Sequence, residues 1–249
     1  MTKRLIYTVC IGQPRPLWQR CIASMRTYCE RHGIEHRLQT EMALRVMPKH
    51  SHRSPQAVAL GGLPNLEKLH GLSLLGDYSQ IALVDADVWA TPDAPDIFDA
   101  VNPAVDFAGC VEREMECTPA YARKLDGYAH GQYGDARFPF FNCGVEVFNA
   151  SMARHLHSQT IPEFIERPEF ADLIDGKGAW KWASEQTLMN VWLRSCGATL
   201  QHLRPRWNVL FGAVTMPADA AFVHFFLSSH LTSEDPEEMI RTGRGRPRV

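Results

Sequence analysis

The chain has 249 residues, of which 45% are hydrophobic and 10% aromatic, so it holds enough apolar side chains for a substantial folded core. Its 26 basic and 28 acidic side chains give a formal net charge of −2. That balance excludes a global field that would draw the whole chain to nucleic acid or to an anionic membrane.

Neither membrane insertion nor secretion is expected. No apolar run approaches the roughly 20 residues of a membrane span, and the apolar start of the chain meets Gln13 and Pro14 too soon for a signal peptide. The seven cysteines are odd in number and lack CxxC spacing, which predicts reduced thiols in a cytoplasmic protein rather than zinc ligands or disulfides. They are Cys10, Cys21, Cys29, Cys110, Cys117, Cys143 and Cys196.

The first elements predict a βαβ opening. Residues 4–11 form an apolar run that ends at Gly12, which is typical of a buried strand. Apolar residues then recur every four positions over 17–32 before Gly33, so a helix is expected, and IEHRL supplies a second strand. The loop after the first strand of such a unit is a usual ligand position.

The middle of the chain mixes irregular and periodic segments. Residues 45–64 lack periodicity and predict a loop, whereas leucines at helical spacing predict a helix over 66–75. The strand IALV follows and ends at Asp85, and an apolar patch covers 105–111. The next segment, about 112–140, is long for a plain connection and is a candidate substrate lid or acceptor loop.

The last third predicts a strand over 140–149, a helix from ASEQ to Gly197 and a final strand over 220–226. The tail from Ser233 is charged and rich in Gly and Pro, so we expect it to be loosely ordered. The predicted organisation is one α/β domain over 1–232 followed by a flexible tail over 233–249.

Two carboxylates mark the end of the IALV strand. Asp85 and Asp87 are separated by the small Ala86 where the strand leaves the core, so both can bind one hard cation such as Mg²⁺ or Mn²⁺. A cation there would offset the charge of a phosphate leaving group. A DxD pattern alone is weak evidence, because carboxylates at strand ends also cap helices or face solvent.

Several segments together resemble glycosyltransferase family eight, the group that includes glycogenin and the bacterial lipopolysaccharide galactosyltransferases. In chain order they are LEKLHGLSLLGDYSQIALVDADVW, FNCGVEVFN, ASEQTLMNVW, RPRWNVL and FVHFF. The resemblance implies the GT-A fold, a Rossmann-like α/β fold with a mixed, mostly parallel central sheet. It also implies transfer of a sugar, a hexose or a related one, from a UDP-sugar, with retention of anomeric configuration and with Mn²⁺ or Mg²⁺ as cofactor.

The resemblance also implies the site residues. Asp85 and Asp87 match the family's DxD, and His224 matches the later histidine that completes the cation site. Lys68 matches a lysine that reaches the phosphates or the donor sugar. Each lone residue has a plainer interpretation, since a histidine in an apolar strand is usually a core side chain and a lysine on a helix is usually solvated.

The remaining implied residues surround the nucleotide and the sugar. Thr8 and Val9 lie where the family holds the base, and Asn142 and Cys143 lie where it contacts the donor sugar. Glu185 and Gln186 match an acidic residue and a glutamine on the sugar face. The acidic group would bind sugar hydroxyls and the Gln carbonyl would stabilise an oxocarbenium-like transition state. A carboxylate nucleophile is the alternative route to retention, and the sequence leaves both open.

The chain departs from the family pattern at two places. Glu185 stands where the family has Asp, and the sequence HFFLSSHL replaces HxxGxxK after the metal histidine. Leu227 therefore takes the place of a glycine, and His230 takes the place of a phosphate-binding lysine. The imidazole of His230 could replace the lysine as a hydrogen-bond donor to the phosphate at lower pH, or a different basic residue could close over the site.

Three other functions compete with this one. Arg244 to Pro247 resemble the core of an AT-hook, which would make a modified DNA base the acceptor. A nucleotidyltransferase would need a Gly-rich phosphate loop after the first strand, which this chain lacks. A non-catalytic sugar-binding module would lose its metal ligands, whereas all three are present here. Trp180 and Trp182 are further candidates for acceptor contacts.

Overall fold

The computed structural model describes residues 3–48, 54–115, 139–177, 185–211, 216–226, 231 and 233–243, with the backbone alone for 54–56 and 113. A six-stranded sheet in the order β2-β1-β3-β6-β5-β7 lies at the centre, and a three-stranded sheet in the order β4-β9-β8 lies beside it. The strands are β1 Arg4–Val9, β2 Glu35–Gln39, β3 Gln80–Asp85, β4 Val88–Ala90, β5 Phe107–Val111, β6 Phe141–Asn149, β7 Leu200–His202, β8 Val209–Leu210 and β9 Phe222–His224.

The directions of the strands determine where the carboxyl ends of the parallel strands lie in the central sheet. β1 runs parallel to β2 and β3, and β5 runs parallel to β7. β6 is antiparallel to both of its neighbours, β3 and β5, so five strands point one way and one points back. The predicted α/β fold with a mixed, mostly parallel sheet is confirmed. The beginning of β6 thus meets the carboxyl ends of the other strands.

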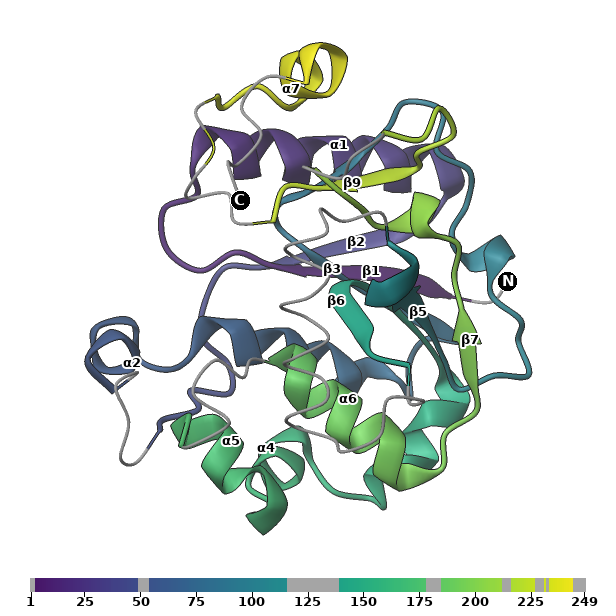
Figure 1. The fold of residues 1–249 in the computed structure, drawn as a ribbon. Helices are drawn as coiled ribbons and strands as arrows, with labels where there is room; N and C mark the ends of the chain where they lie inside the picture. The colour runs from purple at the N-terminus through teal and green to yellow at the C-terminus, as the bar shows by residue number, and fades with distance from the viewer. Residues whose placement is uncertain are drawn as a thin grey trace.

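Helices cover both faces of the sheet (Figure 1). α1 and β9 lie on one face, and α4, α5 and α6 lie on the other. The α-helices of the described residues are α1 Pro16–His32, α2 Ser54–Leu60, α4 Ile161–Ile165, α5 Ala171–Asp175, α6 Glu185–Cys196 and α7 Pro236–Thr242. The 3₁₀ helices are η1 Pro64–Leu74, η2 Phe98–Ala100, η3 Glu112–Glu114, η4 Ala150–Leu156, η5 Pro168–Phe170 and η7 Pro205–Trp207.

The alternation of side chains along the strands explains the two cores. Leu5, Ile81 and Leu83 face η1 and α6, whereas Ile6, Ala82 and Val84 face α1. Successive side chains of a strand point to opposite faces of its sheet, so apolar strands with no polar alternation become buried on both sides. Gly33 ends α1 in the left-handed region at φ 63°, as its sequence position predicts.

Three elements differ from the sequence-based expectation. The leucine-rich segment is the 3₁₀ helix η1 rather than an α-helix, and the predicted loop over 45–64 contains α2. Part of the tail that we expected to be loosely ordered forms α7, whose Met239 is fully buried against α1. The structure describes only the two ends of the predicted lid over 112–140. The tail motif at 244–247 lies outside the described residues.

Two smaller observations concern the whole chain. Six cysteines, all those of the sequence except Cys117, are free thiols, and Cys117 lies outside the described ranges. Among the helices described, none has both the length and the apolar character that crossing a membrane requires.

Candidate functional site

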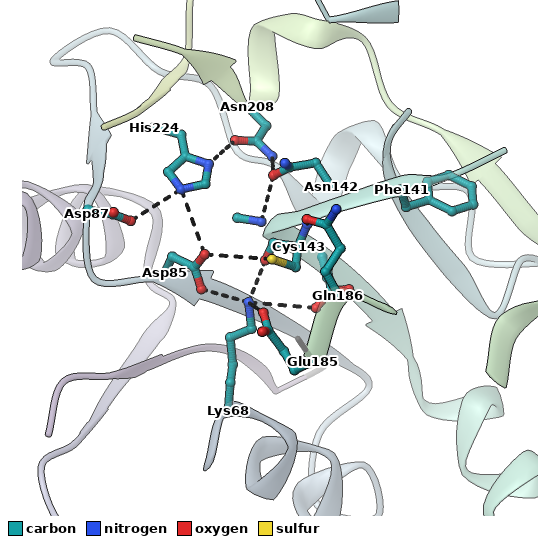
Figure 2. Close-up of polar contacts among 12 residues, drawn as sticks. Lys68, Asp85, Asp87, Phe141, Asn142, Cys143, Glu185, Gln186, Asn208 and His224 are labelled. Carbon is teal, nitrogen blue, oxygen red and sulfur yellow. Dashed lines mark hydrogen bonds and ion pairs between the residues drawn. The ribbon is translucent and has the colours of Figure 1, made fainter. Parts of the chain in front are cut away.

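Asp85, Asp87 and His224 meet at the carboxyl edge of the parallel strands (Figure 2). Asp85 ends β3, and Asp87 lies in the turn that leads into β4. β4 pairs with β9 so that Val88 lies opposite His224. The Nε2 atom of His224 lies 3.3 Å from Asp87 Oδ1 and 3.8 Å from Asp85 Oδ2. The second sheet therefore brings a histidine from the end of the chain to two carboxylates from its first half.

The imidazole of His224 is held on its other side by an amide. Its Nδ1 lies 3.1 Å from Asn208 Oδ1, and Asn208 Nδ2 donates to Asn142 Oδ1 at 2.7 Å. Gly144 lies directly against the ring, since a Cβ at this position would come within 2.3 Å of His224 Nδ1. The ring thus has one fixed orientation, with Nε2 directed at the two aspartates.

The donor set fits a divalent cation. One ligand atom from each of Asp85, Asp87 and His224 lies within 4.8 Å of the others, and His224 is 6% exposed. Two carboxylate oxygens and one imidazole nitrogen form a mixed set of oxygen and nitrogen ligands for such a cation. Burial opposes a charged imidazole, but the Asp87 and Asp85 carboxylates outweigh it and raise the pKa of His224 above its ordinary value.

Lys68 is buried against Asp85 rather than exposed at the cation site. Its Nζ lies 2.7 Å from Asp85 Oδ1, 2.5 Å from the Cys143 carbonyl oxygen and 3.2 Å from Glu185 Oε1, and the residue is 3% exposed. The ammonium donates hydrogen bonds to Asp85 Oδ1 and to the Cys143 carbonyl, and it forms an ion pair with Glu185. Lys68 therefore orients one oxygen of Asp85 and leaves the other, Oδ2, facing His224.

A second network lies on the side of Gln186. Cys143 N–H donates to Gln186 Oε1 at 3.1 Å, and Gln186 Nε2 donates to Glu112 Oε1 at 2.9 Å. Asn142 Nδ2 donates to the same oxygen of Glu112, also at 2.9 Å. Glu112 is 4% exposed, and burial raises the pKa of its carboxyl despite these hydrogen bonds. The two amides and the carboxylate hold one another in place.

Glu146 is a buried carboxyl close to this cluster. It lies on β6, is 0% exposed, and its Oε2 is 4.0 Å from Lys68 Nζ. Within the described residues neither of its oxygens has a hydrogen-bond partner. Burial raises the pKa of Glu146 to about 8, although Lys68 opposes the rise.

The structure thus brings eight predicted residues into one connected set: Lys68, Asp85, Asp87, Asn142, Cys143, Glu185, Gln186 and His224. Val9 lies beside the set, in register with Asp85 across β1 and β3. The side chain of Thr8 is buried and contacts His36, with 3.3 Å between Oγ1 and His36 Nε2. His230, Trp180 and Trp182 lie outside the described residues.

Sequence reasoning missed Glu112, Asn208 and Glu146. Glu112 follows directly after β5, so it carries the same signal as Asp85, a carboxylate at the end of a buried strand. Asn208 lies within the RPRWNVL segment, yet only its neighbours in space show that it contacts His224. Glu146 is a charged residue within an apolar strand, a pattern that is unusual enough to attract attention.

Comparison with known proteins gives a fold but no family. No protein-family model matches the sequence, and no curated protein matches it. A solved glycosyltransferase involved in the glycosylation of the major capsid of PBCV-1 is similar in structure, with 15% identity, a TM-score of 0.53 and coverage of 93% of this chain and 95% of that one. The galactosyltransferase LgtC, solved with donor and acceptor sugar analogues, has 15% identity, a TM-score of 0.52 and coverage of 95% and 99%. The chain therefore has the GT-A fold, and these solved structures that share it are glycosyltransferases.

Proposed function

We propose that this chain is a glycosyltransferase that moves a sugar from a UDP-sugar to an acceptor with the help of a divalent cation. The observation that carries the proposal is the meeting of Asp85, Asp87 and His224 at the carboxyl edge of a GT-A sheet. Open α/β sheets bind their ligands at this edge. The resemblance to family eight supports two finer points of the proposal, a hexose as the sugar and retention of its configuration.

The proposed cation site would stabilise the leaving group. Asp85, Asp87 and His224 would hold a divalent cation, with Mn²⁺ preferred to Mg²⁺, and that cation would supply positive charge to the diphosphate leaving group. Lys68 supports this site by holding Asp85 Oδ1, so its ammonium acts on the phosphates through Asp85. The strand end at Thr8 and Val9 supplies the base-binding edge. His230 would complete the phosphate contacts.

The sugar lies on the other side of this cluster in our proposal. Asn142 and Cys143 begin β6 and line the donor side, and Gln186 begins α6 next to Glu185. Gln186 Oε1 has a second lone pair besides the one that accepts from Cys143 N–H, and that lone pair is available to an electron-poor sugar carbon. Glu185 would bind sugar hydroxyls. We propose a saccharide as the first acceptor class to test.

The test measures nucleotide binding by calorimetry. We expect the wild-type protein to bind UDP with Mn²⁺ and to lose this binding in EDTA, and Asp87→Asn to weaken it at least tenfold because a cation ligand loses its charge. Asp93→Asn removes an exposed carboxylate six positions after Asp87 in the sequence, and this variant should bind as the wild type does.

A positive result would be followed by a screen of UDP-sugars for hydrolysis and transfer. The anomeric configuration of the product, read by NMR, decides retention. Absence of metal-dependent binding to any nucleoside diphosphate would refute the proposed transferase and favour a binding module.

A further inference from the structure

A chain of side-chain amides runs from the backbone of β6 to the metal-facing histidine. Asn142 Oδ1 accepts from Gly144 N–H at 2.9 Å and from Asn208 Nδ2 at 2.7 Å. Asn208 Oδ1 then faces His224 Nδ1 at 3.1 Å. Asn208 is 0% exposed and Asn142 is 5% exposed, so these contacts are shielded from water.

The backbone fixes the direction of every hydrogen bond in this chain. A backbone N–H can only donate, so the Asn142 atom next to Gly144 is the amide oxygen. The amide nitrogen of Asn142 is then directed at Glu112, which as a carboxylate accepts it. Because Asn142 presents an oxygen to Asn208, Asn208 must donate its nitrogen there and present its own oxygen to His224.

The consequence for His224 is a defined position for one proton. Asn208 Oδ1 can only accept, so the hydrogen bond requires a hydrogen on His224 Nδ1. The lone pair available to a cation is then on Nε2, the nitrogen that faces Asp85 and Asp87. Metal-binding histidines commonly have such an oxygen acceptor behind them, and its loss typically lowers metal affinity about 10- to 100-fold.

We propose that Asn208 is a positioning residue that keeps the proton of His224 on Nδ1, with Asn142 and Glu112 as its anchor. The role of Asn208 in metal binding rests on the proposed function, whereas the position of the proton follows from the hydrogen bonds among the protein's own side chains. Packing is the competing explanation, since His224 is buried against Gly144 and its ring lies 6.3 Å from that of Phe226. Asn208 would then only fill space.

The first experiment uses the metal-free protein. In ¹H–¹⁵N spectra of histidine side chains, assigned with His224→Gln, we expect a protected Nδ1–H signal of His224 in the wild type. Asn208→Asp gives up the hydrogen bond donated to Asn142 but retains an acceptor oxygen for His224 Nδ1, so it should retain the signal. Asn208→Leu fills a similar volume without an acceptor and should lose the signal, because Nδ1 then has no acceptor whereas Nε2 still faces Asp87.

The second experiment measures Mn²⁺ affinity by calorimetry. Asn208→Leu should bind Mn²⁺ about 10- to 100-fold more weakly than the wild type, whereas Asn208→Asp should not fall below it. Asn149→Leu is the matched control, since Asn149 is another buried amide of β6, bonded to the carbonyls of Asn102 and Val105. It should lower the melting temperature but leave the His224 signal and the Mn²⁺ affinity unchanged.

The outcomes separate the two proposals. A folded Asn208→Leu protein that keeps the protected Nδ1–H and binds Mn²⁺ within twofold of the wild type would overturn the role of Asn208. A wild-type protein with no proton on Nδ1 would overturn it as well. If the wild type shows the protected proton yet binds no Mn²⁺, the positioning inference stands and the proposed cation site fails.

Discussion

Glu146 shows how a single buried acid can set the pH range in which the protein is most stable. Its pKa is raised by burial to about 8, above its ordinary value of 4.5, so the folded state binds a proton that the unfolded state releases. Between these two values the folded state carries more protons than the unfolded state. The free energy of unfolding therefore falls as pH rises through this window, and the decrease levels off above pH 8.

Glu146→Gln should remove this dependence. Between pH 6 and pH 8 the wild type should lose about 2 kcal/mol of stability through Glu146, and the variant should lose that much less. Urea unfolding at both pH values gives the difference directly. Glu169→Gln, a change at an exposed glutamate, should follow the wild type. Equal pH dependence in wild type and Glu146→Gln would show that Glu146 is ionised in the folded protein.

At the scale of elements, β6 is the strand on which the site depends. It enters the sheet against the direction of its neighbours, so its first residues lie at the edge where the parallel strands end. Gly144 in this strand has no side chain, and His224 of β9 occupies the space that a Cβ would need. The close approach of the His224 ring to β6 therefore depends on this glycine.

Gly144→Ala should displace His224 and weaken Mn²⁺-dependent binding of UDP at least tenfold. The added Cβ would lie 2.3 Å from Nδ1 and 2.5 Å from Cε1 of the ring, so the ring must move. Gly76→Ala is the control, because a Cβ there meets no atom within 4 Å among the residues described. Calorimetry on both variants tests the idea, and unchanged binding by Gly144→Ala would mean that the ring position is not critical.

Sequence patterns predicted these elements unevenly. β6 and α6 were predicted almost to their ends, since Phe141–Asn149 and Glu185–Cys196 have strong strand and helix patterns. The leucine spacing of η1 does not distinguish an α-helix from a 3₁₀ helix, because both can bury one side. The contact between Asn208 and His224 joins β9 to a residue 16 positions away, and no local pattern encodes it.

For the whole molecule, the C-terminal segment completes a third core on the outer side of α1. Met239 of α7 is fully buried among residues from α1, β9 and the segment after β8. Glu234 fastens the segment before α7 through Arg15 and the backbone N–H of Leu17, the latter at 2.9 Å. This core packs behind β9 through Val223 and Phe225, the two neighbours of His224.

Met239→Ala should therefore lower the free energy of unfolding by about 2 kcal/mol, the lower end of the range for truncating a buried methionine. Met47→Ala, at a position 44% exposed, should change it by less than about 0.5 kcal/mol. Chemical denaturation of both variants provides the comparison. If Met239→Ala matches the Met47 control, α7 does not contribute to the cooperative fold.

The charges around Lys68 have a consequence for nucleotide binding at the site. Three carboxylates, those of Asp85, Asp87 and Glu185, lie near a single lysine ammonium. A diphosphate that arrived first would meet an excess of negative charge at short range. If the proposed function holds, a diphosphate would bind here only together with a divalent cation, and its binding would depend on the concentration of free metal.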